Sequence, residues 1–311
     1  MPEPLTLLEK RLLEAVRRSA AGAPPPPALG LSGGRDSMVL AAALLRCGLA
    51  FDAWHFNHRW RGAESADDAA WVRGWCRRHG IACTTGTAPS GLPRTEAAAR
   101  TARWRFFQRT ALRRGTACLW LAHHADDRAE TLLLQLLRGA GPAGLAGPRT
   151  RRQIGALTVV RPLSSFRRAE LARLARHWRI EWREDPSNLD PAHRRNLLRQ
   201  RGLPALSRWA GRDVIPLLAR TAEILEAEED HWALQLPGDW PARLPLRSLR
   251  PQSTAWQRRA LRAWLASQGI QDASFEQLEA VRGLILHPAP ARINLNRNRF
   301  CRRSAGHLFL E

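Results

Sequence analysis

The sequence predicts an α/β fold, a doubly wound and mainly parallel five-stranded sheet with helices on both faces. The main observation is an alternation of apolar segments with helical patterns, which is typical of such sheets. A second observation is that polar clusters follow three of the segments, as expected where ligands bind at the carboxyl ends of parallel strands. The predicted strands are 28–31, 51–57, 81–88, 117–124 and 157–163, and the predicted helices are 36–47, 66–80, 96–114, 128–137 and 168–178.

The pattern changes after residue 212, which predicts three parts. Residues 1–212 hold the sheet, 213–236 form a helical linker, and 237–311 form a small α+β domain. The last part has two helical patterns followed by the strand-like segments RINLN and HLFLE. Within the first part, the glycine- and arginine-rich stretch 138–153 interrupts the alternation and is predicted to be a surface loop.

The charge balance favours a nucleic-acid partner. Lys and Arg total 49 against 28 Asp and Glu, a formal net charge of +21, and Lys10 is the single lysine. Between residues 148 and 212, 16 arginines stand against 5 acidic residues. Because this charge is concentrated rather than evenly spread, we favour a polyanionic partner over a generic solubility charge.

Cysteine usage and hydropathy favour a cytoplasmic protein. The five cysteines form no C-x-x-C pair, which argues against structural zinc and against a disulfide framework. No apolar run approaches the ~18 residues that a membrane span needs. The first 22 residues form a charged amphipathic pattern without the apolar core of a secretory signal.

The segment 29-LGLSGGRDSMVL-40 places two glycines, two hydroxyls and a carboxylate between a predicted strand and a helix. In that context glycines let backbone N–H groups approach phosphate oxygens, and a carboxylate beside phosphate requires a cation, which we assign to Mg²⁺. The segment is not a Walker A motif, and by itself it fits a plain strand-to-helix turn equally well. The predicted nucleotide-binding residues here are Ser32, Gly33, Gly34, Arg35, Asp36 and Ser37.

Polar clusters also follow two other predicted strands. His123, His124, Asp126 and Asp127 lie in 122-AHHADDRAET-131, between a buried strand and a helix. One of the two acids is expected to cap that helix, but capping does not account for two histidines and two acids together. A metal or substrate position beside the glycine loop accounts for them better. The other cluster, 55-HFNHRWRGAES-65, also fits a solvated loop.

Four motifs in this order resemble those of the tRNA(Ile)-lysidine synthases, within the N-type ATP pyrophosphatase (PP-loop) group. SGGRDS is shared by the whole group. Four motifs resemble the synthases specifically: 55-HFNHRWRGAES-65, the element that carries Arg100 and Arg103, 122-AHHADDRAETLLLQLLRGAG-141 and 184-EDPSNLDPAHRRNLLRQRGLPAL-206. The likeness is dense over residues 29–206 and weak beyond them. It departs from the family pattern at Arg59, Trp60, Trp104 and Ser164, none of which touches the phosphate chemistry.

The resemblance implies an adenine nucleotide alpha hydrolase-like fold and an ATP-dependent ligation. In such enzymes ATP adenylates the wobble cytidine of an isoleucine tRNA with a CAU anticodon, and free L-lysine then displaces AMP to give lysidine. The implied cofactors are ATP and Mg²⁺, and the implied partners are the tRNA and lysine, with a homodimer compatible with both. Residues 1–212 would then be the catalytic domain, and 237–311 a tRNA-binding domain.

The resemblance and the strand-end chemistry together assign roles to single residues. Asp36 and Asp127 are predicted to hold the metal, and either His123 or His124 is predicted to accept a proton at neutral pH. The arginines are expected to serve phosphates, although salt-bridged or solvated helix faces explain each of them as well. The lysine candidates are Glu130 and Arg61, the phosphate candidates are Arg100, Arg103 (assigned to ATP), Arg195 and Arg199, and the other substrate or RNA candidates are Asn57, His58 and Asn196.

Three other functions stay open at this stage. A tRNA thiolation enzyme of the same group needs paired catalytic cysteines or an iron–sulfur cluster, for which the five cysteines are wrongly spaced. An amidotransferase-type synthetase would have no use for the arginine-rich segment. A catalytically silent RNA-binding protein would not need both acidic motifs, and ATP turnover separates it from the enzymes.

Overall fold

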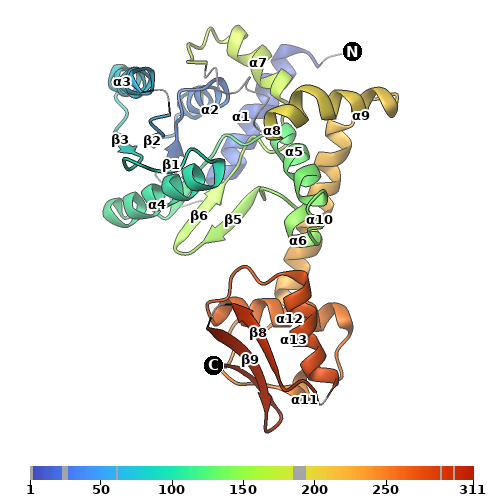
Figure 1. Cartoon of the computed structure of the whole chain (residues 1–311). Helices are drawn as coiled ribbons and strands as arrows, with labels where there is room; N and C mark the ends of the chain where they lie inside the picture. The colour runs from blue at the N-terminus through green and yellow to red at the C-terminus, as the bar shows by residue number, and fades with distance from the viewer. Residues whose placement is uncertain (1–2, 23–26, 61, 185–193, 288, 297) are drawn as a thin grey trace. The chain divides into compact units, whose positions relative to one another are not determined.

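The computed structural model divides the chain into two compact units, residues 1–229 and 230–311. It describes residues 3–22, 27–60, 62–184, 194–287, 289–296 and 298–311 (Figure 1). The boundary between the units falls inside one long helix, α10 (Ile215–Gln235). The predicted limits of the linker, 213 and 236, therefore stay a prediction.

The first unit is built on a six-stranded sheet with the strand order β3-β2-β1-β4-β6-β5. Neighbouring strands from β3 to β6 are parallel, and they are the five predicted strands, so the predicted fold class is confirmed. Their bounds are β1 (Ala28–Gly30), β2 (Asp52–Asn57), β3 (Cys83–Thr87), β4 (Cys118–Trp120) and β6 (Leu157–Val160).

The sixth strand, β5 (Arg151–Ile154), lies where the sequence predicts a surface loop. It pairs antiparallel with β6 at the edge of the sheet, with Ile154 opposite Leu157. Its first three side chains are exposed, so backbone hydrogen bonds hold the strand without an alternating apolar pattern in the sequence. The same stretch also contains a short helix, α6 (Pro142–Leu145).

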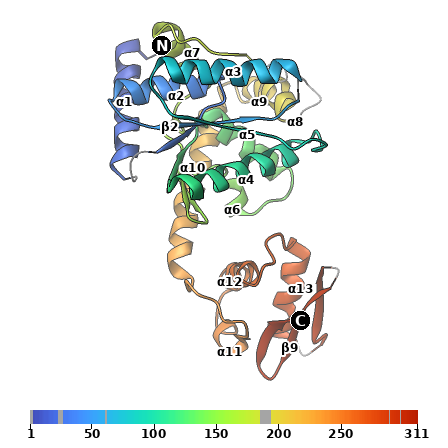
Figure 2. The same cartoon turned by 90° about the vertical axis from the view of Figure 1, so that its left-hand side faces the viewer.

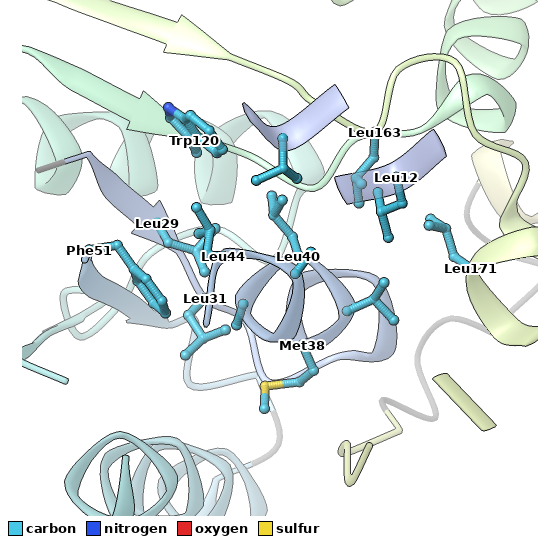
Figure 3. Close-up of a cluster of buried hydrophobic side chains, with 14 of the residues drawn as sticks. Leu12, Leu29, Leu31, Met38, Leu40, Leu44, Phe51, Trp120, Leu163 and Leu171 are labelled. Atoms are coloured by element: carbon cyan, nitrogen blue, oxygen red, sulfur yellow. The ribbon is translucent and has the colours of Figure 1, made fainter. Parts of the chain in front are cut away.

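Helices cover both faces of the sheet because successive strand residues point to opposite sides. Leu29 and Trp120 face a core that includes Leu12, Leu40 and Leu171 (Figure 3). This core is covered by α1 (Leu5–Ala21), α2 (Arg35–Arg46), α3 (Ala63–Arg78) and α7 (Arg168–His177). The neighbouring strand residues, among them Ala28 and Leu119, face a second core under α4 (Glu96–Arg114).

The strands β1 and β4 lie where the chain order reverses. From β1 the chain continues to β2 and β3 on one side, and it then returns to β4 on the other side of β1. In open parallel sheets, ligands bind at such a switch point, outside the carboxyl ends of the strands. The loops after β1 and β4, which carry the two acidic motifs, are therefore neighbours at the functional edge of the sheet.

Helical segments complete the first unit. The helix α5 (Ala125–Leu136) begins shortly after β4. Further along, α8 (Arg194–Leu197), the π-helical turn η2 (Leu198–Gly202) and α9 (Leu203–Trp209) follow one another without a break. A short turn then leads into α10.

The second unit has the predicted α+β character. Its antiparallel sheet has the order β7-β10-β9-β8, and Figure 2 shows α12 and α13 beside the strands. Trp264, Leu278 and Leu308 are among its buried core residues. The elements are β7 (Leu244–Pro245), α11 (Leu246–Leu249), α12 (Thr254–Ser267), α13 (Phe275–Leu286), β8 (Arg292–Asn296), β9 (Arg299–Ser304) and β10 (His307–Leu310).

The cysteines serve packing. All five are free thiols. Cys118 is fully buried in β4, and burial raises its pKa, which keeps it in the unreactive thiol form.

None of the helices within the described ranges has the length and apolar character needed to cross a membrane.

Candidate active site at the ends of β1 and β4

The glycine loop after β1 is braced by its own serines. Gly33 adopts a left-handed φ of +86°, and Gly34 is the N-cap of α2. The Gly34 N–H donates to the Ser32 hydroxyl (3.2 Å), and the Ser37 hydroxyl donates to the Gly34 carbonyl (2.8 Å). The turn thus places the first N–H groups of a 12-residue helix at the end of β1. This is the arrangement that binds phosphate through helix N-termini.

We expect Gly33→Ala to weaken ATP binding about tenfold and to lower the free energy of unfolding by about 1–3 kcal/mol. The left-handed φ strains an alanine, and its Cβ would lie 2.9 Å from Cγ2 of Val72. Gly74→Ala, on α3, is the matched control, because its φ is not left-handed and its Cβ would meet only the flexible end of Arg78, at 3.7 Å. Titration calorimetry with ATP and thermal unfolding measure both effects. Equal losses in the two variants would contradict the assignment of the turn.

Carboxylates from two strand ends converge on His124. Asp36 lies in the first turn of α2 and Asp127 in the first turn of α5. One oxygen of each nevertheless lies 3.5 Å from Nε2 of His124. The N–H of His124 donates to Asp127 (3.0 Å), which also caps α5. The structure therefore brings three of the four predicted catalytic residues together, around a histidine that is almost fully buried.

The pKa values of the two histidines are shifted in opposite directions. Burial lowers the pKa of His124, but Asp127, Asp36 and Asp126 more than offset this and raise it above the ordinary value. Burial lowers the pKa of His123 to about 3, with Arg161 among the groups that add to the lowering. Nδ1 of His123 accepts a hydrogen bond from Nε of Arg161 (3.3 Å), which fits a neutral ring. The role of either histidine as a base stays a prediction.

The donor set at this position suits Mg²⁺. Burial raises the pKa of Asp36, but His124 and Arg35 more than offset this, so its pKa lies below the ordinary value. Burial likewise raises the pKa of Asp127, but His124 and neighbouring cations outweigh this, so its pKa is also lowered on balance. Both groups are therefore carboxylates at neutral pH. Within the described residues, no three His, Cys, Asp or Glu side chains form a complete metal site. Mg²⁺ needs no such cage, because one or two carboxylates, waters and substrate phosphates satisfy it.

Glu130 holds two of the predicted phosphate-binding arginines. Its carboxylate is fully buried and accepts hydrogen bonds from Nε of Arg195 (3.0 Å) and from Nε and Nη2 of Arg199 (2.6 and 2.9 Å). Arg195 also lies 3.6 Å from the exposed Glu96. Of the two interpretations left open for Arg195 and Arg199, phosphate binding or an ion pair within the protein, the structure contains the ion pairs. We call Glu130, Arg195 and Arg199 the carboxylate–arginine clamp.

The remaining predicted residues lie around this centre. The amide of Asn57 is engaged within its own loop: its nitrogen donates to the Ser65 carbonyl (2.9 Å) and its oxygen accepts from the Arg59 N–H (2.7 Å). His58 makes an edge contact with Phe56 at a centroid distance of 4.9 Å. Their roles, like those of Arg100, Arg103 and the buried Asn196, stay predictions. Arg61 and the motif residues 185–190 lie outside the described residues.

The sequence reasoning missed Arg161. This residue directly follows β6, is 5% exposed, and donates through Nη1 to the Arg149 carbonyl (2.6 Å) as well as to His123. Burial and neighbouring arginines lower its pKa to about 10, so it stays charged at neutral pH. Its position could have indicated a functional role, because Arg161 follows a parallel strand at the carboxyl end, as the other predicted site residues do.

Family models match most of the chain. A "PP-loop domain" model matches residues 8–206, and a "TilS substrate binding domain" model matches residues 244–309. The chain is 35% identical over 268 residues to the tRNA(Ile)-lysidine synthase of Thermosynechococcus vestitus, covering 83% of this chain and 77% of that protein. It is 38% identical over 287 residues to the synthase of Pseudomonas aeruginosa, covering 84% of this chain and 63% of that protein.

A solved structure shares the fold. The U34-tRNA thiolase NcsA from Methanococcus maripaludis superposes with a TM-score of 0.58, covering 72% of this chain and 80% of that one. The identity is 16%, so the likeness concerns the fold alone. The likeness supports the fold class.

Proposed function

The chain belongs to the tRNA(Ile)-lysidine synthase family of PP-loop proteins, and we propose from this that it joins free lysine to C2 of the wobble cytidine of an isoleucine tRNA with a CAU anticodon. One observation carries the proposal beyond the likeness. Asp36 and Asp127, from two different strand ends, meet at His124 beside a helix N-terminus. A protein that only binds RNA gains nothing from carboxylates placed there, whereas a reaction on ATP phosphates requires a cation site.

In the first step, the C2 carbonyl oxygen of the cytidine forms a bond to the α-phosphorus of ATP. The bond from that phosphorus to the bridging oxygen breaks, and pyrophosphate leaves. The N–H groups at the start of α2 would donate to the leaving phosphates and stabilise the charge that develops there. Asp36 and Asp127 would hold Mg²⁺, which would supply neutralisation of the phosphate charge. Arg161 adds a buried cation beside His123.

In the second step, the ε-amine of lysine forms a bond to C2. The bond between C2 and its oxygen breaks, AMP leaves, and the amine loses a proton. The amine must be neutral before it attacks, although the pKa of lysine is about 10.4 in water. A group that accepts the proton, and an environment that excludes water, are therefore both required of the site.

The carboxylate–arginine clamp is a candidate site for the backbone of the lysine substrate. A free amino acid carries an ammonium and a carboxylate, which match the charges of Glu130 and its two arginines. Lysine would exchange with the internal ion pairs, its ammonium on Glu130 and its carboxylate on an arginine. Within the clamp, the carboxylate of Glu130 pairs with the arginines. Lysine offers one charge of each sign, so the exchange leaves no buried charge unpaired.

The test of the proposed function is a reaction with labelled ATP and an isoleucine tRNA transcript carrying the CAU anticodon. AMP and pyrophosphate are expected with tRNA and lysine together, and mass analysis is expected to find lysine on the wobble cytidine. Pyrophosphate without a lysine adduct would retain adenylation and overturn the choice of nucleophile. Absence of ATP turnover would reduce the protein to an RNA binder. The thiolation alternative gains no support, since none of the five free cysteines lies on the loops after β1 and β4.

A further inference from the structure

Trp209 stands apart from the other tryptophans. The chain has 13 tryptophans, and all of them lie within the described residues. The other twelve are buried or half-buried, whereas Trp209, the last residue of α9, is 87% exposed. A single exposed hydrophobic side chain is ordinary on a protein surface, so the exposure of Trp209 gains its meaning from the charged residues that accompany it.

Three arginines whose side chains lack partners lie close to Trp209 in the sequence. Arg201, Arg208 and Arg212 are all exposed, and the side chain of none of them makes a hydrogen bond or ion pair with any residue that the structure describes. The nearest acid in sequence, Asp213, is already bound by Arg167. We call Trp209 with these three arginines the α9 patch.

The α9 patch is joined to the candidate active site by one helical segment. Arg199 is bound to Glu130, and the chain continues through η2 and α9 to Trp209 without leaving helical conformation. Ten residues at about 1.5 Å each place the Trp209 backbone roughly 15 Å along the segment from Arg199. Stacked nucleotides on one strand rise about 3.4 Å each, so that distance corresponds to roughly four of them.

We propose that the α9 patch is a platform for the anticodon loop of the tRNA, with Trp209 stacking on an unpaired base and the arginines contacting the adjoining phosphates. The identity of this RNA rests on the proposed function. Aromatic stacking on splayed bases with arginines along the backbone is the usual way proteins hold single-stranded RNA. The three arginines concentrate positive charge on this segment, which favours an anionic partner. A second copy of this chain does not fit, because a symmetric dimer through the patch would bring like charges together.

The stacking role is tested by the affinity of the full-length protein for a labelled tRNA transcript, measured by fluorescence anisotropy without ATP or lysine. Trp209→Ala and Trp209→Leu are expected to weaken binding about tenfold or more, and Trp209→Phe to stay within about threefold of wild type. Leu137→Ala, an equally isolated side chain that is 80% exposed, is the matched control and is expected to leave affinity unchanged. A Phe variant as weak as the Ala variant would overturn stacking, as would equal losses on a fully paired RNA duplex.

The electrostatic role is tested by the salt dependence of the same binding. Arg208→Gln together with Arg212→Gln is expected to reduce the slope of log affinity against log salt by about one to two. Arg18→Gln, at the exposed end of α1, is the control and is expected to leave the slope unchanged. Unchanged affinity and slope, with a change of mass by sedimentation, would overturn the proposal in favour of a protein interface. Because no ATP is present, these results are independent of whether lysidine is formed.

Discussion

Asp36→Asn is expected to lower ATP turnover by roughly 10³-fold while the protein stays folded. Among the described residues, the carboxylate makes polar contacts with Arg35 and His124, and 26% of its side chain is exposed. An amide of the same shape keeps the packing of α2 but removes the charge that the cation requires. His124 retains Asp126 and Asp127 as acidic neighbours. The loss should therefore fall on the reaction and leave thermal stability nearly unchanged.

The measurement is pyrophosphate release with a tRNA transcript, alongside thermal unfolding and tRNA affinity. Asp67→Asn is the matched control, because Asp67 is an exposed acid on α3 and is expected to have no effect on turnover. A rise in the Mg²⁺ concentration needed for half-maximal rate in a milder variant, Asp36→Glu, would support the metal role. An Asp36→Asn protein that keeps turnover within tenfold of wild type would remove Asp36 from the chemistry.

The parallel sheet and the position of the site were predictable because the signals are local. Each apolar segment between helical patterns became a strand, and glycines beside acids marked the loops after β1 and β4. The edge strand β5 was not predictable in this way, because exposed arginines in an edge strand look like a loop. The strand is defined by its pairing with β6, and that pairing leaves no periodic trace in the sequence.

Long-range pairing explains the rest of what the sequence could not show. Glu130 and its arginines are separated by 65 and 69 positions, so no spacing rule connects them. The sequence allowed phosphate binding and ion pairing equally for Arg195 and Arg199, and only the fold shows the ion pairs. Likewise, composition offers 13 tryptophans without indicating which is exposed. Burial is a property of the packed chain, and it singles out Trp209.

Glu130→Gln is expected to raise the KM for lysine about 100-fold and to lower the free energy of unfolding by roughly 3 kcal/mol. The amide carries a donor toward two guanidinium groups that are themselves donors, and it leaves their charges uncompensated. Glu96→Gln is the matched control. Glu96 contacts Arg195 at 3.6 Å, but its side chain is 65% exposed, so we expect less than about 0.5 kcal/mol and no change in KM.

Comparing substrates separates the two roles that Glu130 can have. If the clamp receives lysine, pyrophosphate release with tRNA alone survives in Glu130→Gln, and only the lysine-dependent step weakens. Arg199→Gln should then show the same pattern, because it removes the partner of the lysine carboxylate, and lysine should stabilise the wild type but neither variant against heat. If Glu130 only positions the arginines for ATP, both variants lose pyrophosphate release and the KM for lysine stays constant. That second outcome would show that lysine binds at a part of the site away from the clamp.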